Sequence, residues 1–166
     1  MCGECWRYCY KFPMNDHDFL AKAFRGDADA VNLALTLSRV SHVWDDLIDK
    51  DKPVKDESIN RAFYALLVEL PSNPFYRKHM ETLVPILAMS ALNYEIANAF
   101  EKTGNREKLA LAHVLRYSAA DIATVIALII GGPDWVRLIG PELRQRCQKD
   151  TLGNYLSEHQ LTGAMP

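Results

Sequence analysis

Apolar residues recur at intervals of three and four along most of this chain, the spacing that places side chains on one face of an α-helix. The pattern is clearest from Asp27 to Lys50, after which Pro53 prevents the helix from continuing. Capping residues, glycines and prolines divide the remainder into further predicted helices, at 15–24, 56–70, 73–102, 105–130 and 141–149. No alternating run of β-branched residues indicates a strand.

The predicted helices indicate an all-α fold. A chain of 166 residues is long enough for one hydrophobic core and short for two. We therefore predict a single-domain helical bundle over residues 1–166, with a cysteine- and aromatic-rich segment at 1–14 and a loose tail at 153–166. Pro85 should kink its helix, and Gly131-Gly132-Pro133 should end the most apolar one.

Charge and hydropathy exclude several classes of partner. The formal net charge is −2, and acidic and basic residues are interspersed, so we expect no nucleic-acid partner. The longest apolar run, Ile122 to Ile130, is shorter than the roughly 20 residues of a bilayer span, and the N-terminus lacks a secretory pattern. We therefore expect no membrane span and a cytoplasmic location.

Three aspartates gather in the last turns of the helix that ends at Lys50. Asp45, Asp46 and Asp49 follow His42 by three, four and seven positions, and Asp45 and Asp49 share a face. A helix C-terminus already carries partial negative charge, so this cluster favours a neutralising cation, and its oxygen ligands suit Mg²⁺. The alternative is a frayed, solvated helix end balanced by nearby basic side chains.

The segment from Ser41 to Asp49, SHVWDDLID, resembles the first aspartate-rich motif, DDxxD, of the all-α isoprenoid (prenyl diphosphate and terpene) synthases. In that family the aspartates hold Mg²⁺ ions that bind and activate an allylic diphosphate. The resemblance implies a fold that is isoprenoid-synthase-like in part, with Asp45 and Asp49 as magnesium ligands and Asp46 in support. It also implies a small-molecule diphosphate as ligand, and transfer or hydrolysis of the diphosphate as the reaction.

A second polar line follows the helix predicted at 73–102. Asn93, Ala97 and Glu101 stand at four-residue spacing, so they share one helix face. They match in part the Asn-x3-Ser/Thr-x3-Glu pattern of terpene cyclases, with alanine at the hydroxyl position. This line either faces the aspartates or is exposed to solvent.

The helix predicted at 105–130 adds further candidates. His113, Tyr117 and Asp121 share a face, and the apolar run beside Asp121 predicts that its carboxylate needs a partner. Asp121 therefore either takes a structural bond from Tyr117 or an arginine, or joins the proposed site. We expect a structural role for His113.

Cys2, Cys5 and Cys9 form a closely spaced Cys-x2-Cys-x3-Cys motif. With His17 or Cys147 as a fourth ligand it could bind zinc or an iron-sulfur cluster. The interleaved aromatic residues favour the alternative, in which the segment packs on the bundle and cysteine acts as a small apolar residue.

Three functions remain open from the sequence. The preferred hypothesis is Mg²⁺-dependent binding, and turnover, of an isoprenoid-like diphosphate. An all-α nucleoside triphosphate pyrophosphohydrolase is an alternative, because Asp46-x2-Asp49 and Glu95-x2-Asn98 loosely mimic its paired acidic elements. A non-enzymatic helical interaction or assembly protein is another, as a homo-oligomer, and an exposed apolar strip on the first or last long helix would favour it.

Overall fold

The computed structural model describes residues 17–50, 53–148 and 150–162. Within these residues the chain is helical and contains no strand, which confirms the all-α prediction. In chain order the elements are α1 (His17–Ala23), α2 (Ala28–Asp49), α3 (Asp56–Tyr64), the π-helical η3 (Ala65–Glu69), α4 (Leu70–Ser72), α5 (Pro74–Glu101), α6 (Arg106–Leu115), α7 (Ala119–Cys147) and α8 (Leu152–Thr162).

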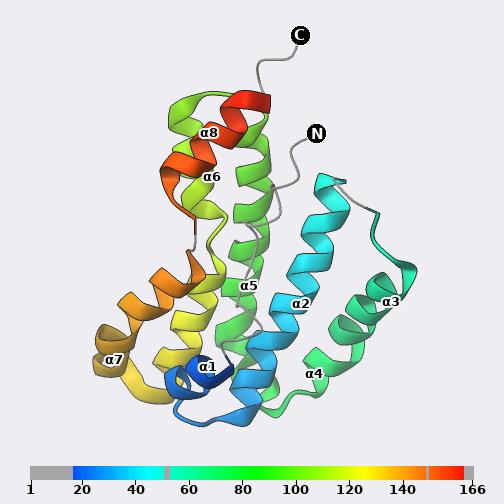
Figure 1. The fold of residues 1–166 in the computed structure, drawn as a ribbon. Helices are drawn as coiled ribbons and strands as arrows, with labels where there is room; N and C mark the ends of the chain where they lie inside the picture. The colour runs from blue at the N-terminus through cyan, green and yellow to red at the C-terminus, as the bar shows by residue number, and fades with distance from the viewer. Residues whose placement is uncertain (1–16, 51–52, 149, 163–166) are drawn as a thin grey trace.

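The bundle has its main core at one end and a smaller core at the other (Figure 1). Side chains of α1, α2, α5 and α7 form the main core, and Leu20, Phe24, Leu33 and Ile126 are fully buried in it. The smaller core joins α5, α6 and α8. Its buried residues are Ala97, Leu109, Ala112, Tyr155 and Leu156.

Local signals place the ends of the two helices that carry the aspartates and the second polar line. The Asp27 carboxylate caps α2 by accepting from the Ala30 amide, and the Asn73 side chain caps α5 by accepting from the Tyr76 amide. Lys50 closes α2 in a left-handed conformation, and its amide donates to the Asp46 carbonyl. The acidic turn therefore has a fixed backbone.

The predicted helix at 105–130 is wrong as one element, because α6 ends at Leu115 and α7 begins at Ala119. The predicted end at Gly131-Gly132-Pro133 is confirmed by a break in the helical backbone, although the element α7 continues beyond it. Gly132 has φ +74° and ψ −178°, non-helical angles that reverse the direction of the chain (Figure 1). In α5 the non-helical angles lie at His79, whose ring stacks on Phe75, and not at Pro85.

The prediction of a loose tail over 153–166 is wrong for the described residues, because α8 continues to Thr162. Figure 1 shows α8 lying against α6. Tyr155 and Leu156 are buried in the smaller core. The order of this segment comes from packing partners on α5 and α6, which its own sequence does not indicate.

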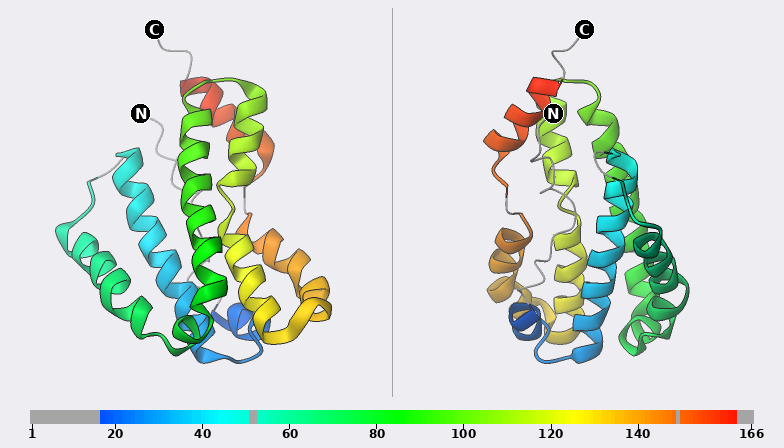
Figure 2. Two further views of the ribbon diagram at one scale, coloured as in Figure 1. Left: turned by 180° about the vertical axis from the view of Figure 1, so that it is seen from behind. Right: turned by 45° about the vertical axis from the view of Figure 1, so that its right-hand side comes forward.

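The segment of α3 and η3 is an arm with little burial. Only Ala65 is buried in these two elements, whereas Phe63 is 59% and Leu67 72% exposed. Figure 2 shows this arm beside α2 at the edge of the bundle. An arm of this kind can enclose a space against α2 and α5.

Two stretches, Pro74–Glu101 and Arg106–His159, contain windows that are apolar enough, by length and composition alone, to cross a membrane. Only 22% and 28% of these windows are buried within the fold. The break between α6 and α7 and the reversal at Gly132 divide the second stretch.

Candidate functional site

The predicted aspartate cluster begins with Asp45, which is held inside the bundle. Its carboxylate accepts a hydrogen bond from the Tyr94 hydroxyl at 2.9 Å and one from Arg116 Nη1 at 3.2 Å. Tyr94 is 1% exposed, and the Asp45 side chain is 17% exposed. Asp45 is thus bound to groups of α5 and of the α6–α7 turn.

Arg116 is the centre of this arrangement, with a side chain that is 5% exposed. Its Nε donates to Glu101 Oε1 at 2.7 Å, and its Nη2 donates to Glu101 Oε2 and to Asn98 Oδ1. The guanidinium carbon also lies 4.9 Å from the centre of the Tyr94 ring. The two parallel bonds to Glu101 are the strongest geometry that a guanidinium and a carboxylate can form.

Helix α8 completes the arrangement. The Tyr155 hydroxyl donates to Glu101, and His159 Nε2 lies 3.8 Å from the same carboxylate. Burial, together with the negative charge of Glu101, raises the pKa of Tyr155 far above its usual range, so the hydroxyl stays a donor. Burial lowers the pKa of His159, with Arg116 adding to the effect while Glu101 and Glu158 oppose it.

We call Asp45, Glu101 and Arg116, with their neutral partners Tyr94, Asn98 and Tyr155, the buried charge network. Two carboxylates and one guanidinium leave one formal negative charge, which hydroxyl donors help to stabilise. The network ties α2, α5 and α8 to the turn after α6. Groups this engaged can hold helices in register and exclude water.

The network does not fit the expected magnesium site. Asp45 Oδ1 already accepts hydrogen bonds from the Arg116 guanidinium and from the Tyr94 hydroxyl, so this oxygen is not available to a metal. In the described ranges no group of three or more His, Cys, Asp or Glu side chains could hold a metal ion. Asp46 is half-buried and Asp49 exposed at the end of α2, and both take part in polar interactions of their own.

The structure brings together part of the second polar line. Glu101 meets Asp45 through Arg116, but the amide that joins them is Asn98, while Asn93 is half-buried one turn away. The facing arrangement is therefore found for Glu101. The cation that connects Glu101 to Asp45 is the guanidinium of Arg116, and not a metal ion.

Asp121 lies outside this network and is paired with Arg144, one of the structural partners that the sequence suggested. The expectation of strongly apolar surroundings is wrong, because the Asp121 side chain is 43% exposed. Tyr117 is buried, and its carbonyl accepts from Arg144 Nη1 at 3.4 Å. Both groups serve the packing of the two halves of α7.

His113 lies buried between the rings of Tyr117 and Tyr155, at centroid distances of 5.3 and 5.0 Å. Its Nε2 lies 3.2 Å from the Asp150 carbonyl. This packing is a structural role.

The proposed cysteine motif, Cys2, Cys5 and Cys9, lies outside the described residues. Of its candidate fourth ligands, Cys147 is buried in the main core and His17 is exposed at the start of α1. The packing environment of Cys147 is that of a small apolar side chain.

An apolar pocket of about 500 Å³ lies beside the network, between α2, the arm, α5 and α7. Its lining is Leu37, Val40, Ser41, Val43, Trp44, Leu47, Ile59, Ala62, Phe63, Leu66, Leu70, Leu87, Ser90, Ala91 and Ile122. The Ser41 hydroxyl donates to the Leu37 carbonyl at 2.7 Å, and the Ser90 hydroxyl to the Ser118 carbonyl at 3.5 Å. Even the polar members of the wall are turned toward the backbone.

Trp44 connects the pocket to the network. Its ring lines the pocket and lies 4.5 Å, between centroids, from the ring of Tyr94, whose hydroxyl holds Asp45. On the opposite side, a smaller cavity of about 230 Å³ shares Val40, Val43 and Ala62 with the pocket. We call this cavity the flank; its wall is mostly apolar, and its polar lining residues are Arg39, His42, Ser58 and Arg61.

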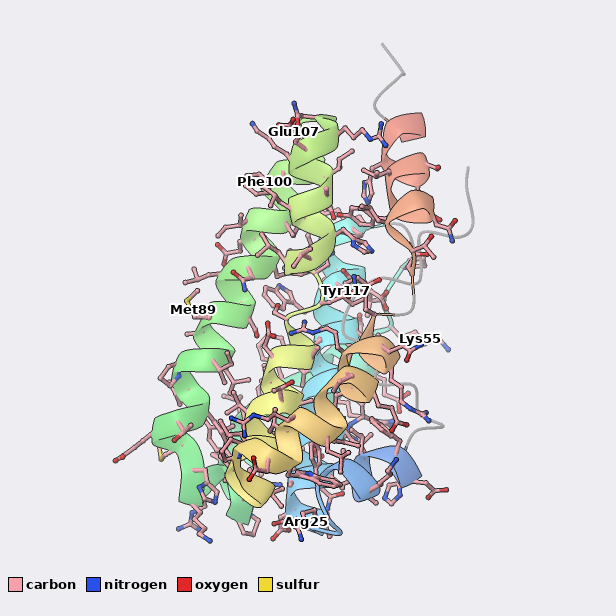
Figure 3. The ribbon with its side chains drawn as sticks, turned by 90° about the vertical axis from the view of Figure 1, so that its left-hand side faces the viewer. Arg25, Lys55, Met89, Phe100, Glu107 and Tyr117 are labelled. Carbon is pink, nitrogen blue, oxygen red and sulfur yellow. The ribbon has the colours of Figure 1, made fainter. Side chains whose placement is uncertain are left out.

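Sequence reasoning missed Arg116 and the pocket. An arginine in the interior of the most apolar predicted helix, 105–130, is a signal that could have been used, because a buried guanidinium needs a carboxylate. The pocket left no comparable signal, since its lining comes from helices that are distant in sequence. In Figure 3 the label of Tyr117 marks the turn that carries Arg116.

Comparison of the chain with protein-family models, curated proteins and solved structures finds no match. Its function must therefore be inferred from its own residues.

Proposed function

We propose that this protein binds a small amphiphilic molecule whose hydrocarbon tail, of isoprenoid-like kind, occupies the apolar pocket between α2, the arm and α5. The observation that carries the proposal is the pocket itself, about 500 Å³ in volume and lined almost throughout by carbon. Small-molecule sites have this size and are mostly apolar. Trp44 and Phe63 supply aromatic surface on opposite walls.

The chemistry of the wall selects a hydrocarbon. The two serine hydroxyls in the lining donate to backbone carbonyls, so a polar ligand group would lose its bonds to water and gain few in return. A chain of on the order of ten carbons suits the volume, and each buried methylene contributes about 0.8 kcal/mol. Binding of an alkyl or prenyl chain follows from these terms.

The polar residues of the flank provide a position for a head group. Arg39 and Arg61 stand there with His42, and each arginine is partly neutralised by an exposed partner, Glu69 or Glu57. An anionic head group would compete for these exposed pairs at low cost, because such pairs are weak. A single amphiphilic ligand could therefore place its hydrocarbon tail in the pocket and its anionic head group at the flank.

The magnesium-diphosphate part of the sequence hypothesis stays a prediction. Asp45 is engaged by Arg116 and Tyr94, which leaves Asp46 and Asp49 as the only members of the motif that this network does not hold. The pyrophosphohydrolase alternative is weakened because Asn98, one of its paired residues, binds Arg116. No reaction step is assigned.

The test is binding of geraniol and of geranyl diphosphate, each with and without Mg²⁺, followed by the thermal midpoint and by tryptophan fluorescence. Ala62→Phe fills the pocket and should abolish the response to both ligands. Leu67→Phe adds the same ring on the arm at a position 72% exposed and outside the lining, and should leave the response intact.

Each outcome separates the parts of the proposal. A response to both ligands without Mg²⁺ supports the amphiphile site. A response only to the diphosphate with Mg²⁺, lost in Asp46→Asn/Asp49→Asn, would support the metal prediction instead. Absence of any response, or an equal response in Ala62→Phe, would overturn the proposed function.

A further inference from the structure

Helix α5 presents an apolar face, on the side away from the pocket, that no other described residue covers. Met80, Val84, Met89, Leu92 and Ile96 are between 43% and 52% exposed. Figure 2, in its left panel, shows α5 running uncovered along the back of the bundle, and Figure 3 shows Met89 directed away from the other helices. The strip lies on a middle helix, whereas the sequence pointed to the first or last long one.

We propose that this face of α5, the α5 face, binds a second copy of the chain through the antiparallel packing of two α5 helices about a two-fold axis. The proposal is independent of the ligand site. Leu87, Ser90 and Ala91 of α5 line the pocket on its other side, so both sites can be occupied at once.

The charge pattern of α5 matches itself in the antiparallel direction. Residues 82–94 carry no charge. The exposed basic residues Arg77 and Lys78 precede this stretch, and the exposed acidic residue Glu95 follows it. In an antiparallel pair the basic end of one helix meets the acidic end of the other, twice, which a parallel pair does not allow. Glu81, also exposed, lies one turn inside Arg77 and does not reverse this pattern.

The spacing of apolar residues agrees with the same axis. An axis midway between Val84 and Ala88 sets Val84 opposite Ala88 of the second copy, and Met80 opposite Leu92. It also sets Arg77 opposite Glu95. The small, exposed Ala88 next to the axis allows the two helices to approach closely.

The area is close to what a stable dimer needs. Leu111 and Val114, 56% and 60% exposed, add apolar surface on α6, the helix that packs along α5. With the five residues of α5 they leave on the order of 600 Å² exposed, the upper end for a monomer. A specific dimer buries about 800 Å² on each partner, so the apolar patch corresponds to about three quarters of that area.

The experiment is sedimentation velocity of the full chain between low and high micromolar concentration. The wild type should be a dimer that dissociates on dilution, and Leu92→Glu should be monomeric throughout. Leu138→Glu changes a residue that is 72% exposed on α7, away from the α5 face, and should leave the dimer intact. Far-UV circular dichroism confirms that each variant is folded.

A charge reversal tests the antiparallel axis. Arg77→Glu and Glu95→Arg should each weaken the dimer several-fold, and the double variant should recover most of the loss. A monomeric wild type, or a dimer unchanged by Leu92→Glu, would overturn the proposal. Flotation with phosphatidylcholine vesicles tests a lipid surface as the other possible occupant of the α5 face. Binding of a monomeric protein to the vesicles would also overturn the dimer proposal.

Discussion

Replacing Arg116 by methionine should destabilise the fold strongly, because two carboxylates would lose their shared cation. The side chains of Arg116, Glu101 and Asp45 are 5%, 11% and 17% exposed, so water cannot take the place of the guanidinium. Removing one partner of such a buried pair costs about 3–5 kcal/mol. That is a large share of the roughly 5–15 kcal/mol that holds a domain folded.

Urea unfolding followed by circular dichroism measures this loss. Arg61→Met is the matched control, because Arg61 and Glu57 form an exposed pair on α3 with side chains 68% and 77% exposed. Exposed pairs of this kind contribute about 0.3–0.5 kcal/mol. The two variants should therefore differ about tenfold in their effect.

Neutralising the carboxylates tests the cause of the loss. Adding Asp45→Asn and Glu101→Gln to Arg116→Met removes the uncompensated charge, so the triple variant should be more stable than the single one. If Arg116→Met alone does not fold, folding of the triple variant would still show that the unpaired carboxylates cause the loss. The reasoning fails if Arg116→Met costs under 1 kcal/mol, or if the triple variant is the least stable of the set.

Three further predictions concern single positions. Gly132→Ala should cost about 1–3 kcal/mol, measured by urea unfolding, because φ +74° with ψ −178° admits glycine almost alone. Asp27→Ala removes the cap of α2 and should cost about 1 kcal/mol in the same assay, whereas Asp27→Asn should cost less. His159 has a pKa below its usual 6.5, so the unfolded chain binds its proton more readily; stability should fall as the pH drops below about 6.5, and His159→Gln should show a smaller fall in thermal midpoint. Equal pH profiles for the two proteins would contradict this.

Several local features could be predicted from the sequence, because their causes lie in neighbouring residues. Helix α2 was expected between Asp27 and Lys50, and α5 from Asn73 to Lys102, close to the observed bounds. Both depend on neighbours in the chain, namely a capping side chain and an apolar period. A partner for Asp121 was also expected and Arg144 is that partner, but the predicted reason, apolar surroundings, is wrong because the Asp121 side chain is 43% exposed.

Other features depend on residues that are remote in sequence. The helical order of α8 could not be predicted, because Tyr155 and Leu156 are stabilised by contacts with α5 and α6 and not by local periodicity. The assignment of Asp45 as a metal ligand stays a prediction, and the partner that Asp45 has in the structure could not be read from its neighbours in the chain. Only the fold brings Arg116, distant in the chain, within 3.2 Å of its carboxylate.

The sequence by itself determined that this protein is helical and where helices α2 and α5 begin and end. Those properties follow from dihedral preferences, caps and the period of 3.6 residues, all of them short-range. The tertiary structure decided which cation pairs with Asp45, that an apolar pocket opens beside it, and that one face of α5 stays uncovered by the other described residues. Burial and pairing are properties of surfaces in contact, and the order of residues along a chain does not state which surfaces will meet.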